Sequence, residues 1–173
     1  MIKLYINTWG NYNENGADGG EWVALPMDAD ELNEKLDSIA ERLRDDDAEF
    51  FINDVDNETD INLRINENDD IFKINEFAEK LETLNKWEYE TLCAIADYFG
   101  FDWEDIDNID EYNLYTDIND ECDLGYYWAV ESGCYNLEKM GNLAYYIDYE
   151  KFGRDIAIES NGGFTPWGFI ERM

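Results

Sequence analysis

The first quarter of the chain alternates between apolar and polar positions in the way that strands do. Ile2, Leu4 and Ile6 alternate with Lys3, Tyr5 and Asn7, which predicts a half-buried strand over residues 2–9. Similar patterns predict strands over residues 21–25 and 49–55. Residues 11–20 are mostly Asn, Gly and acidic residues, a composition typical of a loop.

A helix is predicted between the second and third strands. It begins near Asp28 or Asp30, since either carboxylate can accept hydrogen bonds from the first free N–H groups. Its apolar residues recur at spacings of four, three and four and form one stripe: Leu32, Leu36, Ile39 and Leu43. Residues 1–62 are therefore predicted to form a small domain of one sheet and one helix.

The pattern turns helical over residues 71–100. Two apolar stripes follow each other: Ile74, Phe77, Ala78, Leu81 and Leu84, then Leu92, Ile95, Ala96 and Phe99. Gly100 is suited to end the second helix, because glycine adopts the left-handed conformation there at little cost. We expect a helical domain over residues 63–103.

The last part of the chain is predicted to be mixed. A strand is expected over residues 112–115, a helix after Asn119 or Asp120, and another after Asp148 that buries Phe152 and Ile156. A final strand over residues 164–170 is interrupted by Pro166 and should lie at an edge or a bulge. These elements make up a third domain, residues 104–173. The predicted fold class is α+β, an elongated chain of three small domains.

The composition of the chain excludes several classes of function. The 173 residues include 43 Asp and Glu against 12 Lys and Arg, for a net charge of −31, and 16% are aromatic. Disordered acidic chains are poor in aromatic residues, so a folded protein is expected. Direct binding to nucleic acid is excluded, because contacts to phosphates need cationic side chains. The absence of histidine removes the Ser–His and Cys–His nucleophile systems.

The cysteines indicate a reducing compartment. Cys93, Cys122 and Cys134 are an odd number without a C-x-x-C pair, so we expect reduced, buried thiols and neither disulfides nor a zinc site. The apolar stretch at the start of the chain is too short for a signal peptide, and no apolar run is long enough for a membrane span. A cytoplasmic protein without metal or cofactor is predicted.

Charge is unevenly distributed along the chain. Residues 28–60 hold 14 acidic and 3 basic residues, and residues 97–123 hold 11 acidic and no basic ones. Residues 139–173 are nearly neutral, with 5 acidic and 4 basic residues, and rich in aromatic ones. The acidic body and the aromatic end therefore call for separate explanations.

The acidic body has several alternative interpretations. Solubility needs a net charge of only about 2–8 for a small domain, and the composition is not that expected of a salt-adapted surface. Asn11, Asn13, Asn15 and Gly16 resemble the start of a calcium loop, but Trp22 stands where its bidentate Glu should be. Catalysis by paired carboxylates has no sequence motif to support it.

The remaining interpretation is a shaped anion that occupies a site built for DNA. Duplex DNA carries one charge per ~1.7 Å, so 31 charges correspond to roughly 53 Å of duplex. No single helix reproduces that spacing, so carboxylates of several elements must combine. The candidate partner-binding carboxylates are Asp30, Glu34, Asp37, Glu41, Asp45, Asp46, Asp47, Asp102, Glu104, Asp105, Asp107, Asp110, Glu111, Asp117, Asp120, Glu121 and Asp123.

Two stretches give the chain a family resemblance. Thr8-Trp9-Gly10-Asn11-Tyr12-Asn13, with Gly16 and then Gly20-Glu21-Trp22-Val23-Ala24-Leu25, is similar to the opening of the antirestriction protein ArdA family. Ala144 to Asp155 resembles the aromatic segment of that family, although Gly153 is unexpected within a helix. Residues 123–143 lie where the family keeps its antirestriction motif.

The resemblance implies a non-enzymatic DNA mimic carried on conjugative plasmids and transposons. Such proteins occupy the DNA-binding groove of type I restriction–modification enzymes. The resemblance also implies three small domains in a curved rod and a homodimer formed through the C-terminal domain. Its candidate dimer residues are aromatic: Tyr126, Tyr127, Tyr145, Tyr146 and Tyr149. Two alternatives stay open, an acidic decoy or chaperone for basic DNA-binding proteins, and a metal-responsive binding module.

Overall fold

The computed structural model describes the backbone of residues 1–173 and every side chain except that of Glu138. It is a mixed α+β structure with two small antiparallel sheets of three strands each, which confirms the predicted fold class in this coarser form. Contacts divide the chain into two compact units, residues 1–84 and 85–173. The three-domain division stays a prediction.

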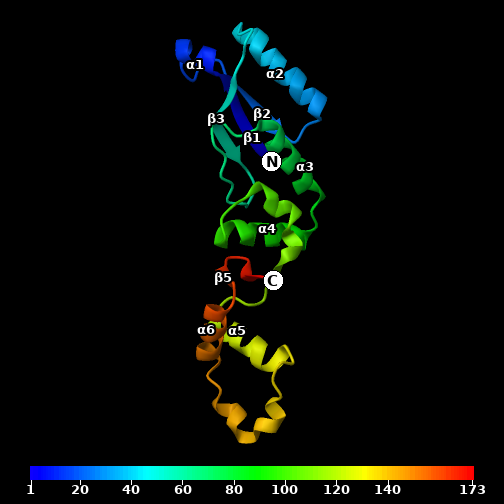
Figure 1. Ribbon diagram of the computed structural model, residues 1–173, viewed down its shortest axis with the longest axis vertical. Helices are drawn as coiled ribbons and strands as arrows, with labels where there is room; N and C mark the ends of the chain where they lie inside the picture. Colours follow the sequence, from blue (N-terminus) through cyan, green and yellow to red (C-terminus); the bar gives the residue numbers. More distant parts are fainter. The chain divides into compact units, whose positions relative to one another are not determined.

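The sheet of the first unit is built from the three predicted strands (Figure 1). β1 (Ile2–Thr8) lies in the centre and pairs antiparallel with β2 (Glu21–Leu25) and β3 (Phe50–Asn57). The apolar positions of β1 are at most 1% exposed, as their alternation predicts.

The predicted helix between the strands is α2 (Ala29–Leu43), which lies along this sheet (Figure 1). Asp28 is its N-cap, and its carboxylate accepts a hydrogen bond from the backbone N–H of Asp30. Leu32, Leu36 and Ile39 of the apolar stripe are buried, and Leu43 is half-buried. The stripe and the cap were therefore both predicted correctly.

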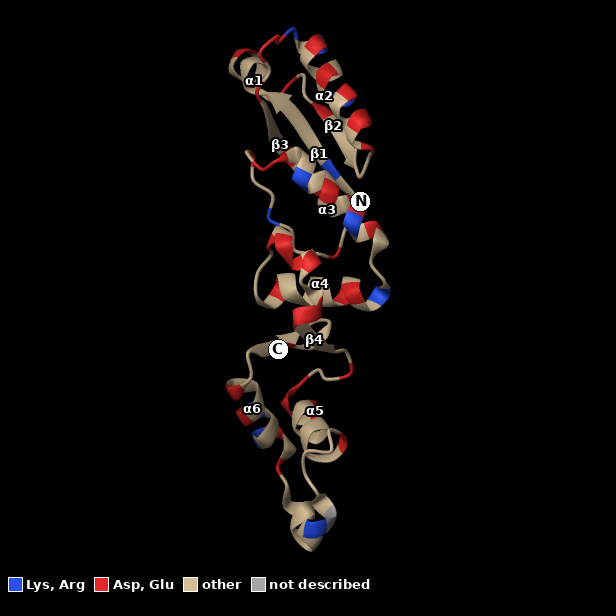
Figure 2. Cartoon of the chain, turned by 45° about the vertical axis from the view of Figure 1, so that its right-hand side comes forward, with Lys and Arg blue, Asp and Glu red and all other residues tan. Residues whose placement is uncertain are grey.

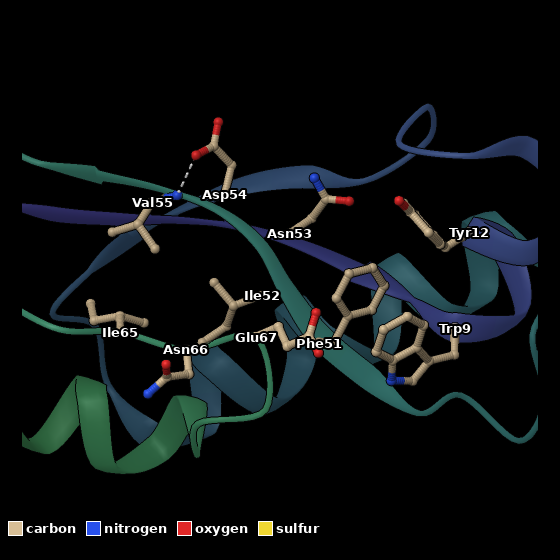
Figure 3. Close-up of a pocket in the computed structure, with 10 residues that line it drawn as sticks. All are labelled: Trp9, Tyr12, Phe51, Ile52, Asn53, Asp54, Val55, Ile65, Asn66 and Glu67. Atoms are coloured by element: carbon tan, nitrogen blue, oxygen red, sulfur yellow. Dashed lines mark hydrogen bonds between the residues drawn. The ribbon is translucent and has the colours of Figure 1, made fainter.

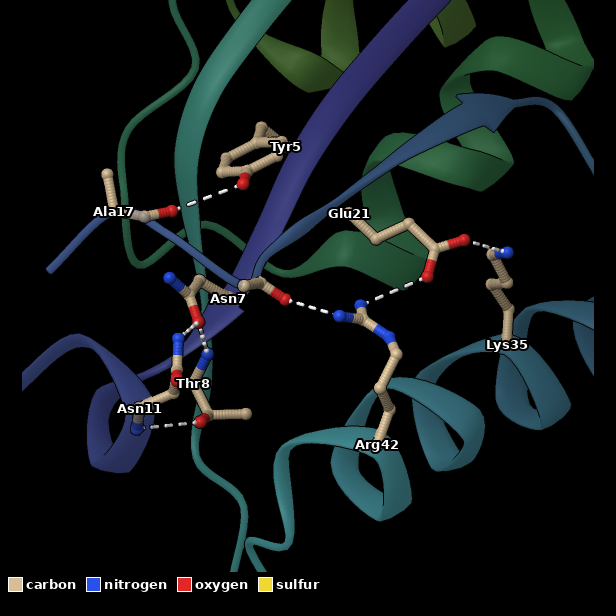
Figure 4. A network of polar contacts seen from close by, with 9 residues as sticks. Tyr5, Asn7, Thr8, Asn11, Ala17, Glu21, Lys35 and Arg42 are labelled. Carbon is tan, nitrogen blue, oxygen red and sulfur yellow. Dashed lines mark hydrogen bonds and ion pairs between the residues drawn. The ribbon is translucent and has the colours of Figure 1, made fainter. Parts of the chain in front are cut away.

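The predicted loop over residues 11–20 is wrong in its first half, since α1 (Trp9–Asn15) is a helix. Asparagine is a poor helix former, but here it builds a buried network (Figure 4). The Asn7 Oδ1 accepts from the Thr8 N–H at 2.8 Å and from the Asn11 Nδ2 at 2.9 Å. Thr8 caps the helix by accepting from the Asn11 N–H. Local side-chain hydrogen bonds thus compensate for the low intrinsic helix propensity of asparagine.

α3 (Ile71–Thr83) belongs to the first unit and contacts β2. The buried Asn75 holds it there, because its side chain accepts from the Met27 N–H at 2.9 Å and donates to the Met27 carbonyl at 2.8 Å. Because an amide side chain has both a donor and an acceptor, Asn75 pairs with the N–H and the C=O of the same residue and so fixes the position of α3.

The second unit begins with α4 (Lys86–Tyr98), which starts in a capping box between Asn85 and Glu88. Gly100 follows its C-cap with φ of 91°, as predicted for a helix stop. The sheet of the second unit has the strand order β4 (Tyr112–Tyr115), β6 (Gly168–Arg172), β5 (Gly162–Thr165).

The single strand predicted over residues 164–170 is wrong, because β5 and β6 are the two arms of a hairpin. Thr165 pairs with Gly168, and Pro166 and Trp167 form the connection. Proline at a fixed φ and Gly168 at φ of 122° suit a turn, so Pro166 marks a reversal of the chain where an interruption was expected.

Short helices make up the rest of the second unit. The turns η1 (Trp103–Asp107) and η2 (Ile109–Glu111) precede β4. After it come α5 (Glu121–Tyr126), which continues into the π turn η3 (Tyr127–Glu131), then η4 (Leu137–Tyr146) and α6 (Tyr149–Glu159). The predicted helix after Asp148 is thus present, with Phe152 and Ile156 half-buried.

α5 and α6 cross at a pair of glycines. A Cβ on Gly153 would lie 1.7 Å from the Glu121 carbonyl oxygen, and one on Gly125 would lie 1.9 Å from the Tyr149 carbonyl oxygen. Real Cβ atoms never come within 3.0 Å of such atoms. Gly153 therefore stands inside a helix because the neighbouring backbone occupies the place of a side chain.

Aspartate begins four of the α-helices and one of the 3₁₀ turns. Its carboxylate accepts a hydrogen bond from a backbone N–H of the first turn at five positions: Asp28, Asp70, Asp102, Asp120 and Asp148. A negative charge there also faces the positive end of the helix dipole. Part of the unusual charge thus contributes to folding.

The cysteines differ from the prediction. Cys93 is buried, as expected, but Cys122 and Cys134 are exposed, and all three are free thiols. Leu124 and Gly125 form the buried side of α5, which leaves Cys122 exposed, and Cys134 lies in the bend that follows η3. Among the described residues, no helix is long and apolar enough to cross a membrane.

Candidate functional site

An exposed acidic stripe runs along α2, on the side turned away from the sheet (Figure 2). Asp30, Glu34, Asp37 and Glu41 make up this stripe and are all exposed. At 100° per residue they fall within about 60° of one another and opposite the buried leucines. The rise per residue spreads them over ~16.5 Å, so the stripe presents a line of four carboxylates.

The bases of α2 are paired with a carboxylate of β2 (Figure 4). Lys35 and Arg42 both pair with Glu21 on β2, and Arg42 also donates to the Gly19 carbonyl at 2.7 Å. Hydrogen bonding to Lys35 is the main cause that holds the pKa of Glu21 below its ordinary value. Among the described side chains, none forms an ion pair with the four stripe carboxylates.

Asp45, Asp46 and Asp47 follow directly after α2. Arg44, the C-cap, has φ of 57°, which turns the chain out of the helix. Asp46 and Asp47 are exposed, but Asp45 is half-buried and its Oδ2 has no hydrogen-bond partner. Acidic residues at a helix C-terminus face the negative end of the dipole. Stability of α2 does not account for these three residues.

The second group of predicted carboxylates lies between η1 and α5. Most are exposed, namely Asp102, Glu104, Asp107, Asp110, Glu111, Asp117, Asp120 and Asp123, whereas Asp105 and Glu121 are half-buried. Several also hold backbone: Asp102 and Asp105 form a reciprocal capping box, and the Asp123 Oδ2 accepts from the Asn119 N–H. Glu111 pairs with Arg172 at 2.5 Å.

Asp105 is the carboxylate in this group whose pKa is raised. Burial is the main cause, and the neighbouring Asp102 carboxylate adds to it. The hydrogen bond from the Asp102 N–H at 2.9 Å and the charge of Arg172 act in the opposite direction. Two acids are thus held close together at a cost to the ionised form.

The predicted dimer tyrosines fall into two sets. Tyr145 and Tyr146 on η4 are 86% and 84% exposed, and Leu143 beside them is 69% exposed. Tyr126 and Tyr149 contact each other edge to face, with ring centroids 5.5 Å apart, across the α5–α6 pair. Tyr127 packs within the unit against Tyr115. An exposed apolar patch therefore lies on η4.

The first unit also has a pocket that the sequence did not predict. It lies between α1, β3 and residues 65–67, and aromatic and acidic side chains line it (Figure 3). Its residues come from elements whose packing was not predicted, and the only signal in the sequence was the density of aromatic residues at 9–12 and 50–51. Within the described residues, no group of three or more Cys, Asp or Glu side chains is arranged to hold a metal ion.

Comparison with known proteins places the chain in a family. A search of curated proteins found no match. The model of a protein family described as antirestriction protein (ArdA) matches residues 4–171, which cover both compact units and almost the whole chain. The resemblance seen in the sequence is thereby confirmed. The chain belongs to the ArdA family of antirestriction proteins, which are non-enzymatic inhibitors.

Proposed function

We propose that this protein is a DNA mimic that occupies the DNA-binding groove of type I restriction–modification enzymes. By doing so in the cytoplasm it protects incoming DNA, such as that of a conjugative element, from restriction. The observation that carries the proposal is the acidic surface itself. Both units present rows of exposed carboxylates, and the basic residues of α2 are engaged by Glu21.

Attraction between opposite charges should stabilise the complex and make it sensitive to salt. A groove that binds DNA presents Lys and Arg to phosphates, and the exposed carboxylates offer those groups an alternative partner. Attraction between exposed charges falls with ionic strength, because the Debye length shortens from ~30 Å at 0.01 M salt to ~10 Å at 0.1 M. The three-domain, elongated arrangement belongs to this proposal, since it distributes the charge along a length.

A homodimer through the C-terminal part is also proposed. Tyr145, Tyr146 and Leu143 are largely exposed, in the nearly neutral part of an otherwise acidic chain. Exposed apolar patches favour association with another surface, and low net charge reduces repulsion between two copies. Sedimentation equilibrium of the wild type and of a Tyr145→Ser/Tyr146→Ser variant tests this, with loss of the dimer expected in the variant.

The main test is competition between the protein and duplex DNA for a purified type I methyltransferase. A DNA mimic is displaced by duplex of sufficient length, and its inhibition weakens as salt rises. A general acidic decoy or chaperone would bind any basic protein without dependence on duplex length. If the protein binds lysozyme as tightly as the methyltransferase, the proposal of mimicry is wrong.

Neutralising the acidic stripe provides a sharper test. At about 0.5 kcal/mol for each exposed charge, changing Asp30, Glu34, Asp37 and Glu41 to their amides costs about 2 kcal/mol, or ~30-fold in inhibition. A single change in the stripe such as Asp37→Asn should cost about twofold. The control removes four other exposed acids (Glu76, Glu82, Asp155 and Glu159) and should have a much smaller effect. Equal losses in both variants would show that only net charge matters.

A further inference from the structure

The pocket of the first unit has an aromatic wall (Figure 3). Trp9 stacks on Phe51 with ring centroids 4.0 Å apart and planes inclined by 12°. The Tyr12 ring meets both of them edge on, at 6.0 Å and 5.4 Å. Phe51 is buried under this group, while Trp9 stays half-exposed and Tyr12 is 40% exposed. Aromatic faces that solvent can reach are negative in potential and attract cations.

A β-bulge places an amide at the same pocket. Tyr5 pairs with Asp54 and Ile6 pairs with Ile52, so Asn53 is the extra residue of β3. Its Oδ1 is buried and has no hydrogen-bond partner. A buried acceptor without a partner destabilises the fold, and the χ2 torsion of asparagine is broad enough to turn the acceptor toward an incoming donor. The bulge thus provides an acceptor that the protein itself does not use.

Carboxylates complete the lining. Asp54 and Glu67 are exposed at the pocket, and none of the residues that line it is basic. The Glu67 carbonyl accepts a hydrogen bond from the Ile52 N–H at 2.8 Å, which fixes the far wall against β3. The cavity has a volume of about 470 Å³, large enough for a long side chain. Its charge repels phosphates and nucleotides and attracts a cation.

The aromatic wall, the amide acceptor and the carboxylates together fit a guanidinium group better than an ammonium group. Guanidinium is planar, stacks on aromatic rings and has five N–H donors, whereas ammonium is compact and strongly hydrated. We propose that this pocket receives an arginine side chain of the restriction–modification enzyme, which stacks by Trp9 and Tyr12 and donates to Asn53, Asp54 and Glu67. The proposal rests on the proposed function, because an enzyme that binds DNA offers such arginines to phosphates.

The first test measures arginine binding by the full-length protein alone. N-acetyl-arginine amide is titrated while the indole N–H resonances of the tryptophans are followed by NMR, with Trp9→Phe used to assign the Trp9 signal. A saturable shift of the Trp9 signal with an affinity in the millimolar range is expected. The citrulline analogue, which has the same shape without the charge, should give no saturable shift. Equal shifts with both probes, or no saturation with arginine, would overturn the proposal.

Matched variants then separate the pocket from general charge attraction. Asp54→Asn/Glu67→Gln should weaken arginine binding at least tenfold, whereas Glu76→Gln/Glu82→Gln removes the same charge from exposed positions outside the pocket lining and should change it less than twofold. Similar weakening in both variants would reduce the effect to net charge and refute the pocket.

Inhibition of a type I enzyme is measured separately with the same variants. Weaker inhibition by several-fold in Asp54→Asn/Glu67→Gln alone supports the docking of an arginine of the enzyme. If this variant loses arginine binding but inhibits as well as the wild type, the enzyme does not use the pocket, and the proposed mimicry is unaffected. If the wild type binds arginine but does not inhibit, the proposed function fails, and with it the identity of the partner.

Discussion

Replacing Gly153 by alanine tests the close crossing of α5 and α6. The new Cβ would lie 1.7 Å from the Glu121 carbonyl oxygen and also near the Gly125 nitrogen, both backbone atoms that cannot rotate away. To restore a contact of 3.0 Å, the helices must move apart by more than ~1 Å, and overpacking of this kind costs about 1–3 kcal/mol.

Helix propensity acts in the opposite direction, since alanine is favoured over glycine by about 1 kcal/mol within a helix. Because the clash involves backbone on both helices, its cost should be at or beyond the upper end of that range, and a net loss of about 2 kcal/mol is expected. For a unit of this size that lowers the melting temperature by roughly 8–16 °C.

Thermal and urea unfolding followed by circular dichroism measure this effect. Ile158→Ala, at a position of α6 that is 76% exposed, is the control and should change stability by no more than about 0.5 kcal/mol. An unchanged or higher melting temperature for Gly153→Ala would refute the close crossing, because only the gain in helix propensity would then remain.

Three further predictions concern charge. The pKa of Asp105 is raised, so its ionised form destabilises the fold; Asp105→Asn should raise the melting temperature at pH 7, and this gain should disappear as the pH falls through the raised pKa. The pKa of Glu21 is lowered, so its ion pairs stabilise the fold above about pH 4.3, and this contribution is lost as the pH falls through the lowered pKa. In urea unfolding, Glu21→Gln should therefore cost up to about 1 kcal/mol for each pair at pH 7 and almost nothing at pH 2. Raising NaCl from 0.05 to 0.5 M should increase the melting temperature while it weakens inhibition, because screening reduces both repulsion within the protein and attraction to the enzyme; opposite signs in either measurement would contradict the electrostatic argument.

Elements with a local signal were predictable. α2 was predicted with its cap because Asp28 and four regularly spaced apolar residues define both its start and its buried side. β4 was also predicted, and its residues alternate between buried and half-buried positions as expected of a strand. In each case the information lies within the sequence of a single helix or a single strand.

Two elements were not predicted although the residues that determine them lie close together in the sequence. α1 depends on Asn7 and Asn11, whose hydrogen bonds are visible only once β1 and the following turn are placed. The hairpin of β5 and β6 did carry a signal, since proline followed two residues later by glycine is typical of a turn and was interpreted as an interruption.

For the candidate site, the exposure of the acidic stripe on α2 followed from helical periodicity alone, because its residues lie opposite a buried stripe. The aromatic pocket could not be predicted, since the bulge at Asn53 is a property of the pairing between β1 and β3. A single strand read by itself has no feature that reveals where its partner slips by one residue.

The capping aspartates allow charge and folding to be separated by experiment. Asparagine caps a helix about as well as aspartate, because its side-chain oxygen accepts the same hydrogen bond. Asp→Asn changes at Asp28, Asp70, Asp102, Asp120 and Asp148 therefore remove five charges while every helix keeps its first turn. Such a chain would be a nearly isosteric, less anionic version of the same protein, in which any loss of affinity reports on electrostatics and not on unfolding.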